Sequence, residues 1–230
     1  PAEFRRVAGP ALYGLDSKPD GKRFVSDLNA SQGLLGDLMF SGPLPEEPGR
    51  MLWVLYEIWK ADRADLSDPH ERTTAAAVAL TFAKKGWPED KALVRYEYFR
   101  DSRRQGLLHP QFDELQTWEK RFVVSAGSNG GWGGAGGWDD ASLVWLRDNV
   151  KLPAKDYVGA CWQAPYRLDN LFGDSIHGSM YYAPFADQIH AKRVRDVGGV
   201  CGSLSHYGAT AARANGIPAI TMGEPGHCAY

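Results

Sequence analysis

The chain has few cysteines, no long apolar run and almost no net charge, and each of these absences excludes a class of protein. Three cysteines occur among 230 residues, and none has the CxxC spacing of a zinc site. Neither a disulfide framework nor structural zinc is therefore predicted. The 26 basic and 28 acidic residues leave a net charge of −2, which gives no support for a nucleic-acid partner. No apolar run approaches the roughly 18 residues that a membrane span needs.

A glycine-rich stretch at 127–138 lacks the motif of a nucleotide-binding loop. It does not end in Gly-Lys-Ser/Thr, and it follows no clear strand. We therefore expect no nucleotide, and no cofactor of any kind. The stretch is interpreted as a surface loop, or alternatively as a lid that carries Trp132 and Trp138 over a groove. The start of the chain shows no secretion signal, so the sequence assigns no compartment.

The first 150 residues contain a series of helical patterns. Ser67-Asp68-Pro69 predicts the start of a helix, because a capping residue precedes a proline at the first helical position. Gly86 is the predicted end of that helix. Apolar spacing and similar end signals predict helices over about 34–39, 51–59, 69–86, 89–106, 112–124 and 140–150. We assign residues 1–150 to a helical region.

The second half of the chain has a different composition. Residues 156–190 are rich in aromatic residues and turn formers, which predicts a shaped loop region rather than helices. Residues 203–215 are rich in alanine and predict a helix that ends at Gly216. The apolar run from Ile217 to Met222 predicts a buried strand.

A cysteine stands where this alanine-rich helix is expected to begin, in Gly198-Gly199-Val200-Cys201-Gly202. A thiol must ionise before it attacks, and the N–H groups at a helix N-terminus favour the anion. His227 follows the predicted strand, so its imidazole can take the thiol proton. We therefore predict that Cys201 is a nucleophile and His227 its base, the alternative being a buried small residue and a turn histidine.

The segments GGVCG, ANGIPAI and GH, in this order, resemble the core of the transglutaminase-like superfamily, a branch of the papain-like cysteine enzymes. The resemblance implies a mostly α, α+β fold, in which the helical region packs on a transglutaminase-like core at residues 151–230. It also implies acyl transfer or hydrolysis at an amide through a thioester. The substrate would be a peptide or protein amide, with a glycan as the alternative, and the enzyme a peptidase, an amidase or a transglutaminase.

The resemblance implies two further groups around the nucleophile. Trp162 or Gln163 would stabilise the oxyanion together with the backbone N–H of Cys201. An aspartate on the strand after the histidine would orient the imidazole, but the sequence ends three residues after His227. We therefore expect a C-terminally truncated form, weak or silent in catalysis, whose open sheet edge allows self-association.

Other assignments stay open at this point. Cys161-Trp162 is similar to the surroundings of the papain nucleophile, but Pro165 would disturb the helix that this nucleophile needs. Cys228 follows His227 directly, so on a strand its side chain would lie on the opposite face. A non-catalytic module that binds peptide or glycan through residues 156–190 is the second functional hypothesis.

Overall fold

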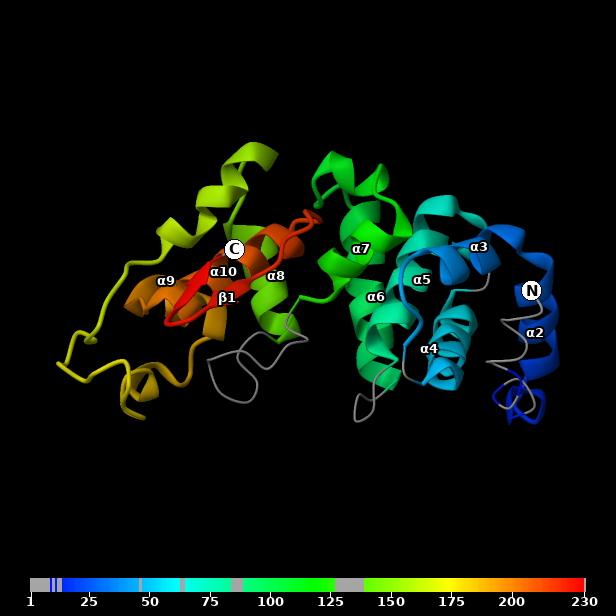
Figure 1. Ribbon diagram of the computed structural model, residues 1–230, viewed down its shortest axis with the longest axis horizontal. Coiled ribbons are helices and arrows are strands. Elements are labelled where there is room, and N and C mark those ends of the chain that lie inside the picture. The colour runs from blue at the N-terminus through cyan, green and yellow to red at the C-terminus, as the bar shows by residue number, and fades with distance from the viewer. Residues whose placement is uncertain are drawn as a thin grey trace. The chain divides into compact units, whose positions relative to one another are not determined.

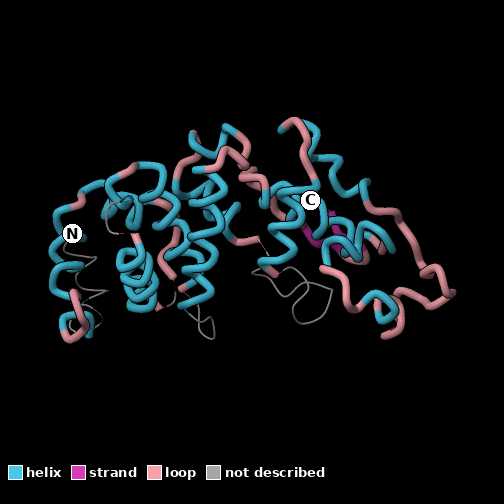
Figure 2. The backbone as a smooth tube through the Cα atoms, turned by 180° about the vertical axis from the view of Figure 1, so that it is seen from behind, coloured by secondary structure: helices cyan, strands magenta, loops and turns pink. Residues whose placement is uncertain are grey.

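The structure is a computed structural model that describes residues 9, 11, 14–45, 47–62, 65–83, 89–126 and 139–229 (Figure 1). Helices dominate these residues, and a single two-stranded antiparallel sheet is found among them (Figure 2). The predicted mostly α, α+β class is confirmed. None of the described helices is long and apolar enough to cross a membrane.

The helices carry the labels of Figure 1. The α-helices are α2 (Gly21–Ala30), α3 (Gln32–Phe40), α4 (Pro48–Ala61), α5 (Pro69–Phe82), α6 (Glu89–Arg104), α7 (Thr117–Val124), α8 (Asp140–Asn149), α9 (His190–Val197) and α10 (Cys201–Ala214). The 3₁₀ helices are η1 (Asp65–Ser67), η2 (Pro110–Asp113), η3 (Ala154–Gln163) and η4 (Ala183–Phe185). The strands are β1 (Met222–Glu224) and β2 (His227–Ala229).

The chain divides into two compact units, each with its own core. The first unit comprises Pro1–Gly106 with Asp113–Ser125, and the second comprises Leu107–Phe112 with Ala126–Tyr230. Helix α8 belongs to the second unit because it packs against α9 and α10. The boundary predicted from the sequence, at residue 150, instead places α8 in the N-terminal helical region.

Helix α5 is the centre of the first unit. It begins as predicted, since Pro69 is its first residue and the Asp68 carboxylate accepts a hydrogen bond from the His70 backbone N–H at 2.8 Å. Its alanines let neighbouring helices approach closely, and α3, α4, α6, α7 and η1 all contact it. A helix that is buried on every side is typical of a core element. The helix ends at Phe82, and the predicted C-cap Gly86 lies outside the described residues.

Lys120 of α7 ties that helix to the first turn of α5. Its side chain is fully buried, and its ammonium donates to the His70 carbonyl at 3.0 Å and to the hydroxyls of Thr73 and Thr74 at 2.8 and 3.2 Å. Burial lowers the pKa of Lys120 to about 8, because the charged form loses its hydration. The hydrogen bonds therefore hold a cation that burial disfavours.

Helix α10 is the centre of the second unit. Its buried side runs from Leu204 to Ala214, and η3, α8, α9 and β2 pack against it. The predicted end is confirmed, because Gly216 takes a positive φ of 84° directly after the last turn. Its hypothetical Cβ would lie 3.1 Å from the side chain of Phe112, so a larger residue would crowd this contact.

The predicted buried strand over Ile217–Met222 is wrong. Only Met222 belongs to a strand, and the Ile220 side chain is 47% exposed. The backbone of this segment bonds to the end of α10 instead of to a partner strand. The Ile217 N–H donates to the Ala212 carbonyl, and the Arg213 guanidinium donates to the Ala219 carbonyl at 2.6 Å. These bonds to the end of the helix outweigh the β propensity of the run.

The loop region predicted for residues 156–190 is wrong over 156–163, which form most of η3, and is confirmed over 164–189, which are irregular chain apart from the short η4. Asn170 is buried and organises it: its Oδ1 accepts the N–H groups of Phe172 and Asp174, and its Nδ2 donates to the Tyr181 carbonyl. Large apolar side chains remain at the surface of this segment. Those more than half exposed are Tyr166, Leu168, Leu171, Phe172 and Met180, and Trp162 of η3 is exposed beside them in sequence.

Candidate functional site

Cys201 is the first residue of α10, as the sequence predicts. Its thiol is free and half-buried. The preceding residue, Val200, has extended backbone and a side chain that cannot accept a hydrogen bond. The N–H groups of the first turn therefore have no side-chain cap from the N-cap residue, and they remain able to stabilise a negative charge on sulfur.

Gly198 and Gly199, which precede Cys201, lie beside residues 165–167. The Gly199 N–H donates to the Pro165 carbonyl at 3.1 Å, and the Arg167 N–H donates to the Gly199 carbonyl at 2.9 Å. Together they form a parallel bridge between Tyr166 and Gly199. Gly198 has φ 92° and ψ −169°, and its hypothetical Cβ would lie 2.4 Å from the Pro165 carbonyl oxygen. Only glycine fits here, both in conformation and in space.

Tyr182 is a site residue that the sequence analysis misses. Its hydroxyl donates to the Gly198 carbonyl at 2.7 Å, and it would lie 3.0 Å from a Cβ on Gly199. Burial raises the pKa of Tyr182, so the phenol stays protonated and remains a donor at neutral pH. The tyrosine therefore fixes the glycine pair that precedes Cys201. The only sequence signal is an aromatic pair, Tyr181-Tyr182, within a region rich in aromatics.

Trp162 and Gln163 end η3, close in sequence to this bridge. Gln163 stands two residues before Pro165, whose carbonyl holds Gly199. The η3 helix also packs against α10. Both side chains are exposed, with 74% of Trp162 accessible. The fold therefore brings the segment that carries both residues to the start of α10, and it leaves their polar groups unburied.

His227 begins β2, as predicted, and this strand packs along α10 (Figure 1). Glu224 and His227 pair across a turn in which Gly226 has φ 78°, typical of a type II turn with proline before glycine. The Ser205 hydroxyl donates to the Cys228 carbonyl at 2.8 Å. Ser205 lies four residues after Cys201, on the same face of α10, so β2 runs beside the face that carries the thiol.

The two predicted catalytic side chains are not joined by a hydrogen bond. Within the described part of the chain, neither the Cys201 thiol nor the His227 imidazole has a hydrogen-bond partner. His227 is exposed, and Cys228 is the more buried residue of β2. Proton transfer between Cys201 and His227 therefore requires the imidazole to turn or a bridging water, which catalytic pairs without substrate commonly need.

Two other histidines of this unit, His190 and His206, have shifted pKa values. His190 begins α9 and is buried, and its ring lies 6.1 Å from that of Tyr182. Burial, assisted by the charge of Arg193, lowers the pKa of His190 to about 4. The pKa of His206 on α10 is also lowered, by burial and by Arg213. Both imidazoles are therefore neutral at pH 7.

The remaining cysteines and the candidate lid occupy other positions. Cys161 lies near the end of η3, not at the start of an α-helix. The glycine-rich stretch with Trp132 and Trp138 lies outside the described residues. No group of three or more His, Cys, Asp or Glu side chains that could hold a metal ion is found where side chains are described.

Comparison of the chain with protein-family models, with curated proteins and with solved structures gave no match.

Proposed function

We propose that the second unit catalyses thiol-dependent acyl transfer or hydrolysis at an amide, with Cys201 as the nucleophile and His227 as the base. The observation that carries this proposal is a free, half-buried thiol at an uncapped helix start, on the face of α10 beside which β2 runs. The resemblance of this region to the transglutaminase-like core supports the same assignment, and peptide or protein amides are the proposed substrates.

The proposed reaction has two steps. The thiolate of Cys201 attacks the amide carbonyl, and the thioester forms as the C–N bond breaks and protonated His227 gives its proton to the leaving amine. Water or an amine then attacks the thioester and loses its proton to His227, the C–S bond breaks, and the Cys201 thiolate and protonated His227 are restored. The Cys201 backbone N–H, with the Gln163 amide or the Trp162 indole, stabilises the oxyanion in both steps.

Alkylation and turnover test this proposal together. Limited iodoacetamide treatment at neutral pH, followed by mass spectrometry, is expected to label Cys201 before Cys161 and Cys228. On a panel of glutaminyl and simple amide substrates, Cys201→Ala should abolish turnover and His227→Ala should lower it about 10²- to 10⁴-fold. The matched variants Cys161→Ala and Cys228→Ala should stay within about twofold of wild type. First labelling of another thiol, or turnover by Cys201→Ala, would contradict the proposal.

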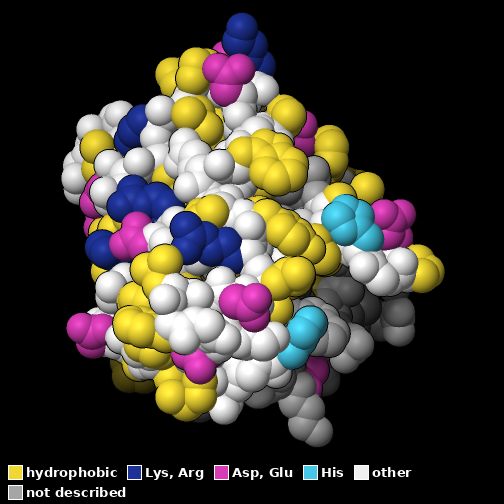
Figure 3. Space-filling model, turned by 90° about the vertical axis from the view of Figure 1, so that its left-hand side faces the viewer, with side chains coloured by type: hydrophobic (Ala, Val, Ile, Leu, Met, Phe, Trp, Pro, Cys, Tyr) yellow, Lys and Arg dark blue, Asp and Glu magenta, His cyan; other side chains and the backbone are white. Residues whose placement is uncertain are grey.

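A second candidate is a non-catalytic module for peptide or glycan. The observation that favours it is the set of exposed apolar side chains between Trp162 and Met180. Figure 3 shows apolar groups at the surface of one face, among charged ones. Large exposed apolar surfaces mark interaction sites. If neither wild type nor any variant turns over a substrate, while Trp162→Ala and Phe172→Ala weaken binding to a peptide or glycan array, this candidate replaces the enzyme.

A further inference from the structure

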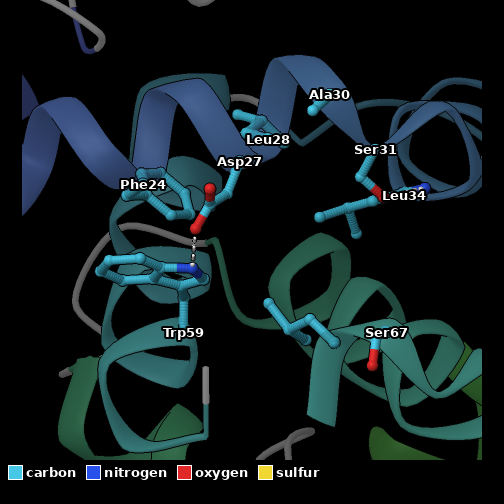
Figure 4. Close-up of a pocket in the computed structure, with 9 residues that line it drawn as sticks. Phe24, Asp27, Leu28, Ala30, Ser31, Leu34, Trp59 and Ser67 are labelled. Carbon is cyan, nitrogen blue, oxygen red and sulfur yellow. Dashed lines mark hydrogen bonds between the residues drawn. The ribbon is translucent and has the colours of Figure 1, made fainter. Parts of the chain in front are cut away.

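The first unit contains a pocket of its own, between α2, α3, α4 and η1 (Figure 4). Its volume is about 320 Å³. This lies at the low end of the range of about 300–1,000 Å³ that is typical of small-molecule sites. The lining residues are Phe24, Asp27, Leu28, Ala30, Ser31, Leu34, Trp59, Leu66 and Ser67.

The wall of the pocket is apolar and partly aromatic. Phe24, Leu28, Leu34 and Trp59 are each buried, at most 3% exposed. The rings of Phe24 and Trp59 meet edge to face with centroids 5.6 Å apart, so the two side chains fix each other's orientation. A ligand in this pocket is therefore expected to present a compact apolar group to a preformed surface.

Asp27 is the single charged residue among those that line the pocket. The Trp59 indole N–H donates to its Oδ2 at 3.2 Å, which holds the carboxylate at the edge of the pocket (Figure 4). Within the described residues Asp27 forms no salt bridge. The Ser31 hydroxyl already accepts the Leu34 N–H at 3.3 Å. The pocket thus combines an apolar wall with one oriented carboxylate, whose partner among the described residues is the neutral Trp59 indole.

We propose that this pocket binds a small organic cation, an ammonium group attached to an aromatic or branched apolar group. The Asp27 carboxylate pairs with the ammonium, and the apolar group packs against Trp59, Phe24 and the leucines. An anion of the same shape is repelled by Asp27, and a neutral analogue loses the ion pair. The proposal concerns the first unit alone and does not depend on the chemistry of Cys201.

Benzylammonium is the probe, with benzyl alcohol and benzoate as its neutral and anionic counterparts. Binding is followed by NMR through the indole N–H resonance of Trp59, assigned by its loss in Trp59→Phe. Benzylammonium is expected to shift this resonance saturably in the millimolar range, and the other two compounds should bind at least fivefold more weakly. Equal binding of all three compounds, or no saturable shift with benzylammonium, would overturn the proposal.

Two variants separate the charge from the apolar wall. Asp27→Asn keeps an acceptor for the indole N–H, so it should lower the affinity for benzylammonium at least fivefold and leave that for benzyl alcohol unchanged. Ala30→Phe fills the pocket from its rim and should abolish binding with Asp27 intact. Asp16→Asn, an exposed acid outside the pocket, should bind as wild type does. Unchanged affinity in both Asp27→Asn and Ala30→Phe would show that the cation binds elsewhere and would refute the assignment.

Discussion

Replacing Gly198 by alanine is expected to destabilise the protein, because it disrupts the contacts that hold the start of α10. The backbone of Gly198, at φ 92° and ψ −169°, lies in a region that essentially only glycine occupies. Forcing alanine into it costs about 1–3 kcal/mol. The new Cβ would also lie 2.4 Å from the Pro165 carbonyl oxygen, so that carbonyl must move.

The displaced carbonyl is the one that accepts the Gly199 N–H. Loss of this hydrogen bond adds about 1 kcal/mol. Gly198→Ala is therefore expected to lower the free energy of unfolding by about 2–4 kcal/mol, measured by urea denaturation with tryptophan fluorescence. Because the same change releases the first turn of α10, the rate of Cys201 alkylation should also change.

Gly223→Ala is the matched control. Gly223 lies in β1, and a Cβ there meets nothing within 4 Å. Alanine should be neutral at this position, or stabilise the protein by a few tenths of a kcal/mol, because it reduces the entropy of the unfolded chain. If Gly198→Ala changes the unfolding free energy by less than about 1 kcal/mol, or no more than the control does, the conformational argument for Gly198 is refuted.

Two predictions concern pH. The pKa of Lys120 is about 8 in the folded protein, against 10.5 in the unfolded chain. Above pH 8 the unfolded state therefore binds more protons than the folded state. The free energy of unfolding rises as a result, by about 2 kcal/mol up to pH 9.5. Urea titrations should show this rise in wild type and in the exposed control Lys22→Met but not in Lys120→Met; a rise that persists in Lys120→Met assigns it to another group. The pKa of His190 is about 4 against 6.5, so the stability gained from its neutral form is present above pH 6.5 and is lost as the pH falls towards 4. His190→Gln should flatten that loss while the exposed His177→Gln leaves it unchanged, and equal acid profiles for both variants would contradict the role of His190.

Features set by neighbouring residues could be predicted from the sequence, whereas features set by distant contacts could not. The start of α5 follows from the capping residue Asp68 and the proline after it. The start of α10 follows from the glycines around Cys201. The error at Ile217–Met222 arises because this segment bonds back to the end of α10, from the Ile217 N–H to the Ala212 carbonyl and from the Arg213 guanidinium to the Ala219 carbonyl. No local pattern encodes which partners an apolar run will find.

The same distinction applies to the candidate site. The order of Cys201 and His227 is visible in the sequence, and their predicted pairing stays a prediction. Tyr182 could not be found, because its role arises from a hydrogen bond to Gly198, sixteen residues further along the chain. Its burial and raised pKa likewise depend on side chains of other elements.

The bridge between Tyr166 and Gly199 couples the start of α10 to the local unfolding of a loop. Residues 165–167 and Tyr182 supply the hydrogen bonds that hold the glycine pair, and they belong to irregular chain organised by a single asparagine. Irregular segments of this kind open at lower free energy than core helices. The backbone amides of Arg167 and Gly199 should therefore lose their protection from solvent exchange together. The frequency with which the Cys201 thiol becomes exposed is then set by the local unfolding of this loop and not by the unfolding of α10.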